Sequence, residues 1–337
     1  MERQPDAATP RTMTVWAQHR YGGPDVVAAE HAAVPSPERA EVLLKVRATG
    51  LNAADARLLR GDPLLIRLFF GLRRPKHAVR GMDVAGTVVA LGSEVREVAL
   101  GDEVVGELSG GGLAPFAIAP VARLVPRPRT VAPEAAAALP MAGGTAWQAL
   151  ELAAVPEGSR VLVVGAGGVV GTFTVQLAAH RGLEVWALAG ARALDLVTSL
   201  GAARAFDYAA VQPGSPELPP DSFDAVFDIA GTAPLRALQR LVRRGGRVVL
   251  VTGHGGRVLG PIGRILRGAL LSIGSSRGIR PLSATAKPDV LRELLDLVAE
   301  GAVRPVVERT YLLDSARDAL AHVDGGHTLG KVVVVAD

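Results

Sequence analysis

Hydrophobic and polar residues alternate along three short segments in the first third of the chain. The alternation runs through residues 41–48, 86–91 and 102–106, and glycines stand at several of the joints. A period of two predicts β-strands that bury one face. Short strands separated by turns favour a small, barrel-like β domain.

From about residue 132 the pattern changes to mostly apolar runs that alternate with helical stretches. Pro133 and Glu134 open the first helix, where proline and an acidic residue are favoured, and residues 146–153 form a second helical stretch. Strand-like runs then occur at residues 161–164, 184–188, 225–228 and 247–251. Apolar strands that alternate with helices predict a parallel sheet covered on both faces.

The last part of the chain returns to a β pattern, which ends at residues 330–335. We therefore predict an α/β protein with a doubly wound, parallel Rossmann sheet, residues 132–281. It is inserted into a discontinuous β-barrel catalytic domain, residues 13–131 and 282–337. Residues 1–12 contain acids and prolines instead of an apolar signal core, so we expect a disordered tail and no export.

Composition adds limits on the class of protein. The 337 residues include no cysteine, which excludes disulfides, thiolate metal sites and cysteine nucleophiles and is consistent with a cytoplasmic location. No uninterrupted apolar run reaches the ~20 residues that a membrane-spanning helix needs. The net charge is +4, but the basic residues are scattered, so we expect no nucleic acid partner.

The densest basic patch, residues 73–76, follows a largely apolar run at residues 64–70. Its simplest interpretation is a solvated loop beside the active site. The sequence also leaves open that this patch meets a membrane surface, as a peripheral contact, or an acidic substrate.

A glycine-rich turn links the strand at residues 161–164 to a helix that covers residues 172–180. Its glycines follow a GxxGxxG spacing, because valine occupies the last glycine position of the strict GxGxxG pattern. Glycines let the backbone approach a pyrophosphate, and a helix N-terminus offers free N–H groups and a positive dipole end. We predict that the turn binds a dinucleotide; the alternative is a tight turn without a ligand. The residues assigned to this contact are Gly165, Gly167, Gly168, Val169, Val170 and Gly171.

The next strand indicates which dinucleotide is bound. Sites for NAD usually carry Asp or Glu ~20 residues after the glycines, on the ribose 2′-hydroxyl. Here the strand ends without an acid before Asp195, and Arg192 would attract a 2′-phosphate. This favours NADPH, although Arg192 could also be a solvated residue in the first turn of a helix. Gly253 and His254 follow the strand at residues 247–251, where doubly wound sheets bind ligands, and are assigned to the cofactor site.

Several motifs resemble the zinc-free, quinone oxidoreductase-like branch of the medium-chain dehydrogenase/reductase superfamily. They are the glycine turn and residues 49–55, 81–86, 101–106, 139–146 and 199–202. The resemblance implies a GroES-like catalytic domain, a nicotinamide cleft between the domains and a homodimer. Zinc-dependent relatives carry Gly-His-Glu where this chain has Gly81-Met82-Asp83, so we expect no metal.

The resemblance also implies roles for single residues. Asn52 and Asp55 would lie near the nicotinamide end of the cofactor, and Thr145 near its ring. Gly190 and Arg192 match the Ser-x-Arg phosphate clamp of relatives, without the serine. Two further residues complete the predicted cofactor site: Tyr208, which matches a tyrosine that contacts the 2′-phosphate in relatives, and Lys331.

Without a metal to activate an alcohol, hydride transfer suits an acceptor that is already electrophilic. NADPH would deliver hydride to the β-carbon, and the protein would donate a hydrogen bond to the developing enolate oxygen. The candidate donors are Asn52 and Lys76, and Asp55 and Asp83 are the candidate orienting groups. The structural alternatives are turn chemistry for Asn52, a helix cap for Asp55 and a solvated side chain for Lys76.

We therefore predict an NADPH-dependent, zinc-independent reductase of quinones or α,β-unsaturated carbonyls. Two alternatives stay open. One is an enoyl-thioester reductase of polyketide or lipid biosynthesis, and the other is a non-catalytic NADPH-binding protein of the same fold.

Overall fold

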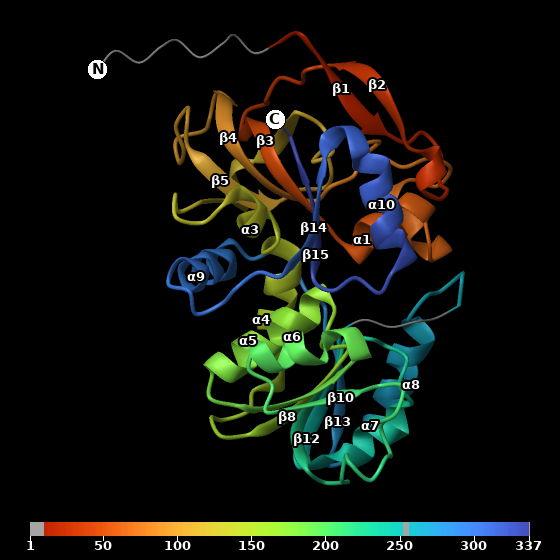
Figure 1. The fold of residues 1–337 in the computed structure, drawn as a ribbon. Helices are drawn as coiled ribbons and strands as arrows, with labels where there is room; N and C mark the ends of the chain where they lie inside the picture. Colours follow the sequence, from red (N-terminus) through yellow and green to blue (C-terminus); the bar gives the residue numbers. More distant parts are fainter. Residues whose placement is uncertain (1–9, 252–255, 337) are drawn as a thin grey trace.

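The computed structural model describes residues 10–251 and 256–336, and most of its strands belong to two large sheets. The seven-stranded sheet lies in one half of the molecule, in red to yellow with blue, and the six-stranded sheet in the other half, in green to blue (Figure 1). A separate antiparallel hairpin is formed by β1 (Thr12–Ala17) and β2 (Ala28–Ala33). Strand β1 begins inside the predicted tail, and residues 1–9 lie outside the described residues.

The seven-stranded sheet takes strands from both ends of the chain. Its order is β14-β15-β3-β4-β5-β7, and β6 also pairs with β3. Strand β3 (Glu41–Leu51) is long enough for three partners: its first half pairs with β6, its second half with β15, and β4 runs along most of its length. The other strands are β4 (Asp83–Leu91), β5 (Glu103–Glu107), β6 (Phe116–Pro120), β7 (Leu124–Pro126), β14 (Val307–Leu312) and β15 (Lys331–Val335).

The six-stranded sheet is parallel throughout, with the order β10-β9-β8-β11-β12-β13. This is the Rossmann order, and ligands bind outside the carboxyl ends of the strands where the order reverses, here between β8 and β11. The strands are β8 (Arg160–Val164), β9 (Glu184–Ala189), β10 (Arg204–Asp207), β11 (Phe223–Asp228), β12 (Val242–Leu250) and β13 (Gly278–Pro281). The predicted α/β fold class is confirmed.

Both faces of this sheet are covered, as the apolar strands require. Val161 and Val163 of β8 pack into one hydrophobic cluster with α4 (Pro140–Ala153) and α5 (Val169–His180), whereas Leu162 and Val164 pack with α7 (Leu235–Leu241) on the other face. The remaining α-helices are α1 (Ala53–Arg60), α2 (Arg67–Phe70), α3 (Pro133–Ala137), α6 (Leu194–Ser199), α8 (Ile262–Ser272), α9 (Pro288–Ala299) and α10 (Ala316–Gly325).

Helix α4 is longer than the predicted stretch at residues 146–153. Pro140 occupies its first turn, and Gly143 lies inside it. A Cβ on Gly143 would lie 3.0 Å from Leu294 of α9, so the missing side chain lets the two helices pack closely. An isolated glycine in a sequence pattern argues against a helix. The contact that favours Gly143 here comes from α9, a distant segment, and so is not visible in the local pattern.

One hydrophobic cluster joins the two sheets. It includes Ala48 and Val333 of the seven-stranded sheet, Val163 and Phe227 of the six-stranded sheet, and Leu294 of α9. We propose that the domain boundaries lie at residues 131/132 and 281/282, since β7 ends just before the first boundary and β13 ends at the second. The interior is therefore continuous across the proposed boundary.

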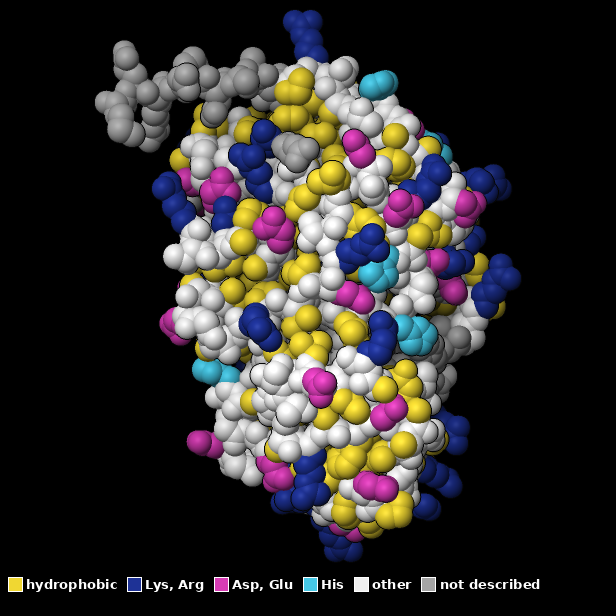
Figure 2. All heavy atoms as spheres, in the orientation of Figure 1, with side chains coloured by type: hydrophobic (Ala, Val, Ile, Leu, Met, Phe, Trp, Pro, Cys, Tyr) yellow, Lys and Arg dark blue, Asp and Glu magenta, His cyan; other side chains and the backbone are white. Residues whose placement is uncertain are grey.

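Figure 2 shows basic and acidic side chains interspersed over the visible face of the molecule. Within residues 10–251 and 256–336, no helix is long and apolar enough to cross a membrane.

Candidate active site

The glycine turn lies after β8, where the order of the Rossmann sheet reverses. Gly165 has φ +89°, a left-handed conformation that favours glycine. A Cβ on Gly171 would lie 2.3 Å from the carbonyl oxygen of Gly165, and a Cβ on Gly167 would lie 2.6 Å from the Cβ of Ala193. These glycines therefore allow α5 and the segment after β9 to pack directly against the turn.

Gly168 differs from the other glycines of the turn because space is open beside it. It is the N-cap of α5, and the nearest atom to an added Cβ is 3.8 Å away. Val169 and Val170 form the first turn of α5 and are half-buried. An open backbone at the N-terminus of a helix fits a pyrophosphate, which can accept the free N–H groups of the first turn.

The residues predicted for the 2′-phosphate gather at the end of β9. The backbone N–H of Tyr208 donates to the carbonyl of Ala189 at 3.0 Å. A Cβ on Gly190 would lie 3.4 Å from the Tyr208 hydroxyl, so glycine at this position leaves room for the tyrosine ring.

Arg192 is exposed, and its guanidinium donates to the carbonyl of His327 at 3.1 Å. A guanidinium has five N–H donors. The contact with His327 therefore leaves most of them for an anion, while it holds the side chain near the end of β9.

Four buried polar residues form a cluster next to the turn, which we call the polar cluster: Asn52, Asp55, Asp83 and Lys331. The Lys331 amine donates to Asn52 Oδ1 and to Asp83 Oδ2, both at 2.7 Å. Asn52 Nδ2 donates to Asp83 Oδ2 at 2.9 Å and weakly to the Gly50 carbonyl at 3.5 Å. The side chains of Lys331 and Asp83 are fully buried and form a direct ion pair, and Asn52 bonds to both of them.

Asp55 holds two backbone segments together. Its carboxylate accepts the N–H of Asn52 and the N–H of Gly81, each at 2.9 Å, and it forms a capping box at the start of α1. Burial raises the pKa of the Asp55 carboxyl, against the opposing effect of these two N–H donors. These contacts match the helix-cap interpretation of Asp55.

Asp83 also meets the start of α4. The N–H of Met141 lies 3.3 Å from Asp83 Oδ1. Thr145 is half-buried and lies one turn further along the same helix. The first turns of α4 therefore connect the polar cluster to the residue predicted to lie near the nicotinamide ring.

Glu107 is a candidate that the sequence patterns miss. It lies opposite Asp83 in the antiparallel register of β4 and β5. Burial, followed by the negative charge of Asp83, raises the pKa of Glu107 to about 7. The available signal was its position directly after the motif at residues 101–106, at the end of a buried strand.

The remaining predicted residues have different locations. Lys76 is exposed on the loop after α2, whereas the polar cluster is buried. Gly253 and His254 lie outside the described residues. Lys331, predicted to contact the cofactor, bonds to Asn52 and Asp83 in the polar cluster.

The glycine turn and the polar cluster are connected through the backbone. Gly168 and Gly330 form an isolated parallel β-bridge, and Lys331 directly follows Gly330. The bridge therefore places Gly168, the open position of the glycine turn, beside the residue that precedes Lys331.

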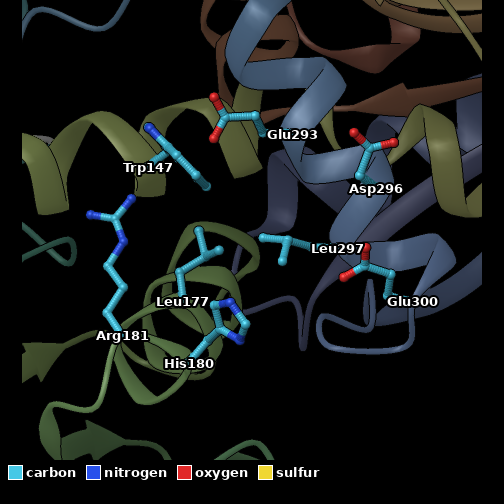
Figure 3. A pocket seen from close by; sticks show the side chains of 8 residues that line it. All are labelled: Trp147, Leu177, His180, Arg181, Glu293, Asp296, Leu297 and Glu300. Atoms are coloured by element: carbon cyan, nitrogen blue, oxygen red, sulfur yellow. The ribbon is translucent and has the colours of Figure 1, made fainter.

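A separate hollow of about 300 Å³ lies between α4, α5 and α9 (Figure 3). Arg181 lies over the Trp147 ring at 4.5 Å, and acidic side chains of α9 face them. The hollow is at the opposite end of α5 from the glycine turn and contains none of the predicted site residues. Its lining residues are Trp147, Leu177, His180, Arg181, Glu293, Asp296, Leu297 and Glu300.

In the part of the chain that the structure describes, no group of three or more His, Cys, Asp or Glu side chains is arranged to hold a metal ion. The Rossmann sheet, the glycine turn and the adjoining polar cluster define an oxidoreductase that uses a nicotinamide dinucleotide.

Comparison with known proteins agrees with this class. Residues 38–129 match the family described as alcohol dehydrogenase GroES-like domain, and residues 200–334 match the family described as zinc-binding dehydrogenase. A chloroplast envelope quinone oxidoreductase homolog of Arabidopsis thaliana is 36% identical over 93% of this chain and 95% of that protein. A chloroplastic NADPH-dependent alkenal/one oxidoreductase of the same plant is 33% identical over 98% of this chain and 81% of that protein.

Among solved structures, the quinone oxidoreductase of Coxiella burnetii superimposes with a TM-score of 0.83 at 26% identity, over 97% of this chain and all of that one. The chain belongs to the medium-chain dehydrogenase/reductase superfamily, in its quinone oxidoreductase-like branch.

Proposed function

We propose that the protein is an NADPH-dependent, zinc-independent reductase of quinones or α,β-unsaturated carbonyls. The observation that best supports this function is the β-bridge between Gly168 and Gly330, because it brings the glycine turn next to the polar cluster. The names of the two plant relatives support the same substrate classes.

NADPH is the proposed cofactor because β9 itself ends without an acid, and the cation of Arg192 and the hydroxyl of Tyr208 lie near its end. Arg192 and Tyr208 would hold the 2′-phosphate, and the open backbone at Gly168 would hold the pyrophosphate. When bound, the cofactor supplies the hydride.

Asn52 is the proposed donor to the acceptor oxygen. Lys331 fixes the amide oxygen and Asp83 fixes one amide hydrogen, while the second hydrogen has only the 3.5 Å contact with Gly50. A donor held in this way needs little reorganisation as negative charge develops on the acceptor. We propose Asn52 over Lys76 because Lys76 is exposed and lies outside the cluster.

The polar cluster also makes a metal unnecessary in this proposal. The buried cation of Lys331 polarises the Asn52 amide, and Met82 occupies the position at which zinc-dependent relatives carry histidine. Elemental analysis of active protein should therefore find no stoichiometric zinc, and chelators should leave the rate unchanged.

The test is Asn52→Ala, assayed by NADPH oxidation with a panel of quinones, enones and enoyl thioesters. Loss of a preset donor should lower turnover by roughly 10²–10³-fold, with NADPH affinity nearly unchanged. Lys76→Ala is the control and should retain activity. Tight NADPH binding by wild type without reduction of any acceptor would instead identify a binding protein, and a strong preference for enoyl thioesters would identify the biosynthetic alternative.

We also propose that the enzyme works as a homodimer in the cytoplasm. Strand β13 is an edge strand of the Rossmann sheet. The neighbouring helix α8 and the residue after it expose Leu266, Leu270 and Ile273. An apolar stripe beside an unpaired strand is suited to a second copy of the chain. Light scattering of the purified protein gives the oligomeric state directly.

A further inference from the structure

We propose that two adjoining segments form a docking face for anionic lipid membranes. The docking face consists of exposed apolar and cationic side chains from two segments: Leu68, Phe69, Leu72, Arg73, Arg74, Lys76, Arg257, Val258 and Leu259. This inference stands apart from the reductase activity, because lipid binding is measured without turnover.

The two segments are joined although they are distant in sequence. The N–H of Leu64 donates to the carbonyl of Arg257 at 2.9 Å, and the N–H of Leu65 donates to the carbonyl of Val258 at 3.1 Å. Gly260 also packs directly on the ring of Pro63. In Figure 1 the orange segment after α1 and the teal segment before α8 accordingly lie next to one another at one edge of the molecule.

The apolar side chains of the docking face are unusually exposed for their size. The exposed fractions are 61% for Leu68, 69% for Phe69 and 65% for Leu72, and Val258 and Leu259 are also more than half exposed. Isolated exposed leucines are ordinary, but a group of large apolar side chains on neighbouring segments indicates an interaction site.

The first segment of the docking face is anchored by contacts of its backbone and of Arg67. The Tyr21 hydroxyl donates to the Gly71 carbonyl at 2.5 Å, and the N–H of Lys76 donates to the Phe70 carbonyl at 2.8 Å. Arg67 stacks on the Tyr21 ring at 4.4 Å. The exposed side chains of this segment therefore project from an anchored backbone.

Both segments of the docking face carry cations and no acidic residue. No acidic residue occurs within residues 63–82 or 256–288, whereas Arg73, Arg74, Lys76 and Arg257 are exposed there. Asp62 is the acid that directly precedes the first segment.

Apolar side chains flanked by cations match the interface of a bilayer that contains anionic lipids. The apolar groups enter the boundary between headgroups and acyl chains, and each cation is attracted to the negative surface. Leu68 and Phe69 stand on the four-residue helix α2 and the other apolar side chains on loops, and such short elements offer no strand edge to a polypeptide partner. A fluid lipid surface needs no such shape, so a membrane is the partner that this chemistry favours.

The position of the docking face relates it to the active site. Its first segment follows α1, whose N-cap is Asn52, and its second follows the carboxyl end of β12. A membrane bound here would lie close to both halves of the site, which suits acceptors that partition into lipid.

The experiment is co-sedimentation of the purified full chain with vesicles, without cofactor or substrate. Vesicles of phosphatidylcholine with phosphatidylglycerol should bind the protein, with binding that falls as salt is added, and vesicles of phosphatidylcholine alone should bind it much less. Each of Arg73→Ala and Arg74→Ala should weaken binding about fivefold. Phe69→Ser combined with Leu72→Ser should weaken it about tenfold or more.

Leu100→Ser is the matched control, because Leu100 is 62% exposed but lies in the loop between β4 and β5. It should bind vesicles as wild type does, and thermal unfolding should confirm that all variants are folded. Failure of wild type to bind anionic vesicles, or equal binding by wild type and the Phe69/Leu72 variant, would overturn the proposal. So would self-association that depends on Phe69 and Leu72 in the absence of lipid, because the face would then belong to a second copy of the chain.

Discussion

The glycine turn and the polar cluster adjoin one another, but they are built differently. The turn is one continuous run, residues 165–171, and its shape follows from what glycine backbones permit. The polar cluster takes side chains from positions that are far apart in the chain, and its shape follows from buried hydrogen bonds to Lys331 and Asp83.

This difference predicts how substitutions impair each region. A backbone site is lost when an added atom displaces the chain. A buried network is lost when one partner is removed, because the remaining charge is left without compensation in the interior. Substitutions in the two regions should therefore affect different quantities.

The largest expected effect is on the polar cluster. Lys331→Met leaves the buried carboxylate of Asp83 without its cation, which should lower the free energy of unfolding by about 3–5 kcal/mol. Chemical denaturation measures this loss. Adding Asp83→Asn to the same chain should restore much of the stability, since the uncompensated charge is removed. If the double variant is no more stable than the single one, the ion pair does not govern this region.

Gly171→Ala should have the next largest effect, on cofactor binding. Its Cβ would lie 2.3 Å from the Gly165 carbonyl oxygen, and overpacking of this kind costs about 3 kcal/mol. We expect the turn to shift, and NADPH affinity to fall well over tenfold in a fluorescence titration. Gly263→Ala in α8 is the control, because an added Cβ there meets nothing within 4 Å. A similar loss in both variants would contradict a specific role for the turn.

Arg192→Ala should change the choice of cofactor. A charge-assisted contact with the 2′-phosphate contributes about 2 kcal/mol, so the Kd for NADPH should rise about thirtyfold while that for NADH changes little. Tyr208→Phe should act in the same direction more weakly, because it removes one hydroxyl. Equal losses for NADPH and NADH would show that Arg192 serves only its contact with the His327 carbonyl.

The smallest expected effect concerns Glu107. Its folded-state pKa is about 7, above the ordinary value of 4.5, so the unfolded chain loses this proton first as the pH rises. Stability should therefore fall between pH 4.5 and 7 and stay reduced above 7. Glu107→Gln should remove this fall and gain ~1 kcal/mol above pH 7, after allowance for solvent on one side of the carboxyl.

Thermal unfolding across this pH range gives the measurement, and Glu217→Gln, at an exposed position, serves as the control. A constant difference between the Glu107 variant and wild type from low to high pH would refute titration of Glu107 as the cause.

The same difference explains which parts of the fold and of the candidate site could be predicted from the sequence. The Rossmann strands and the glycine turn are predictable because periodicity and glycine spacing are local properties. Asn52, Asp55 and Asp83 could be selected only as polar residues within motifs. The contacts of Asn52 and Asp83 with Lys331 could not be predicted, since they depend on β15 pairing with the second half of β3. The register that places Glu107 opposite Asp83 is likewise a property of two paired strands.

The bridge between Gly168 and Gly330 also has a consequence for how the protein is made. A ribosome that has added Pro281, the last residue of the Rossmann sheet, must add about 50 more residues before Lys331 exists, which takes several seconds at typical elongation rates of about 5–20 residues per second. During this interval the nascent chain already contains the glycine turn and the whole sheet that holds it, but Asp83 still lacks its cation. The order of synthesis therefore completes the Rossmann sheet before the polar cluster.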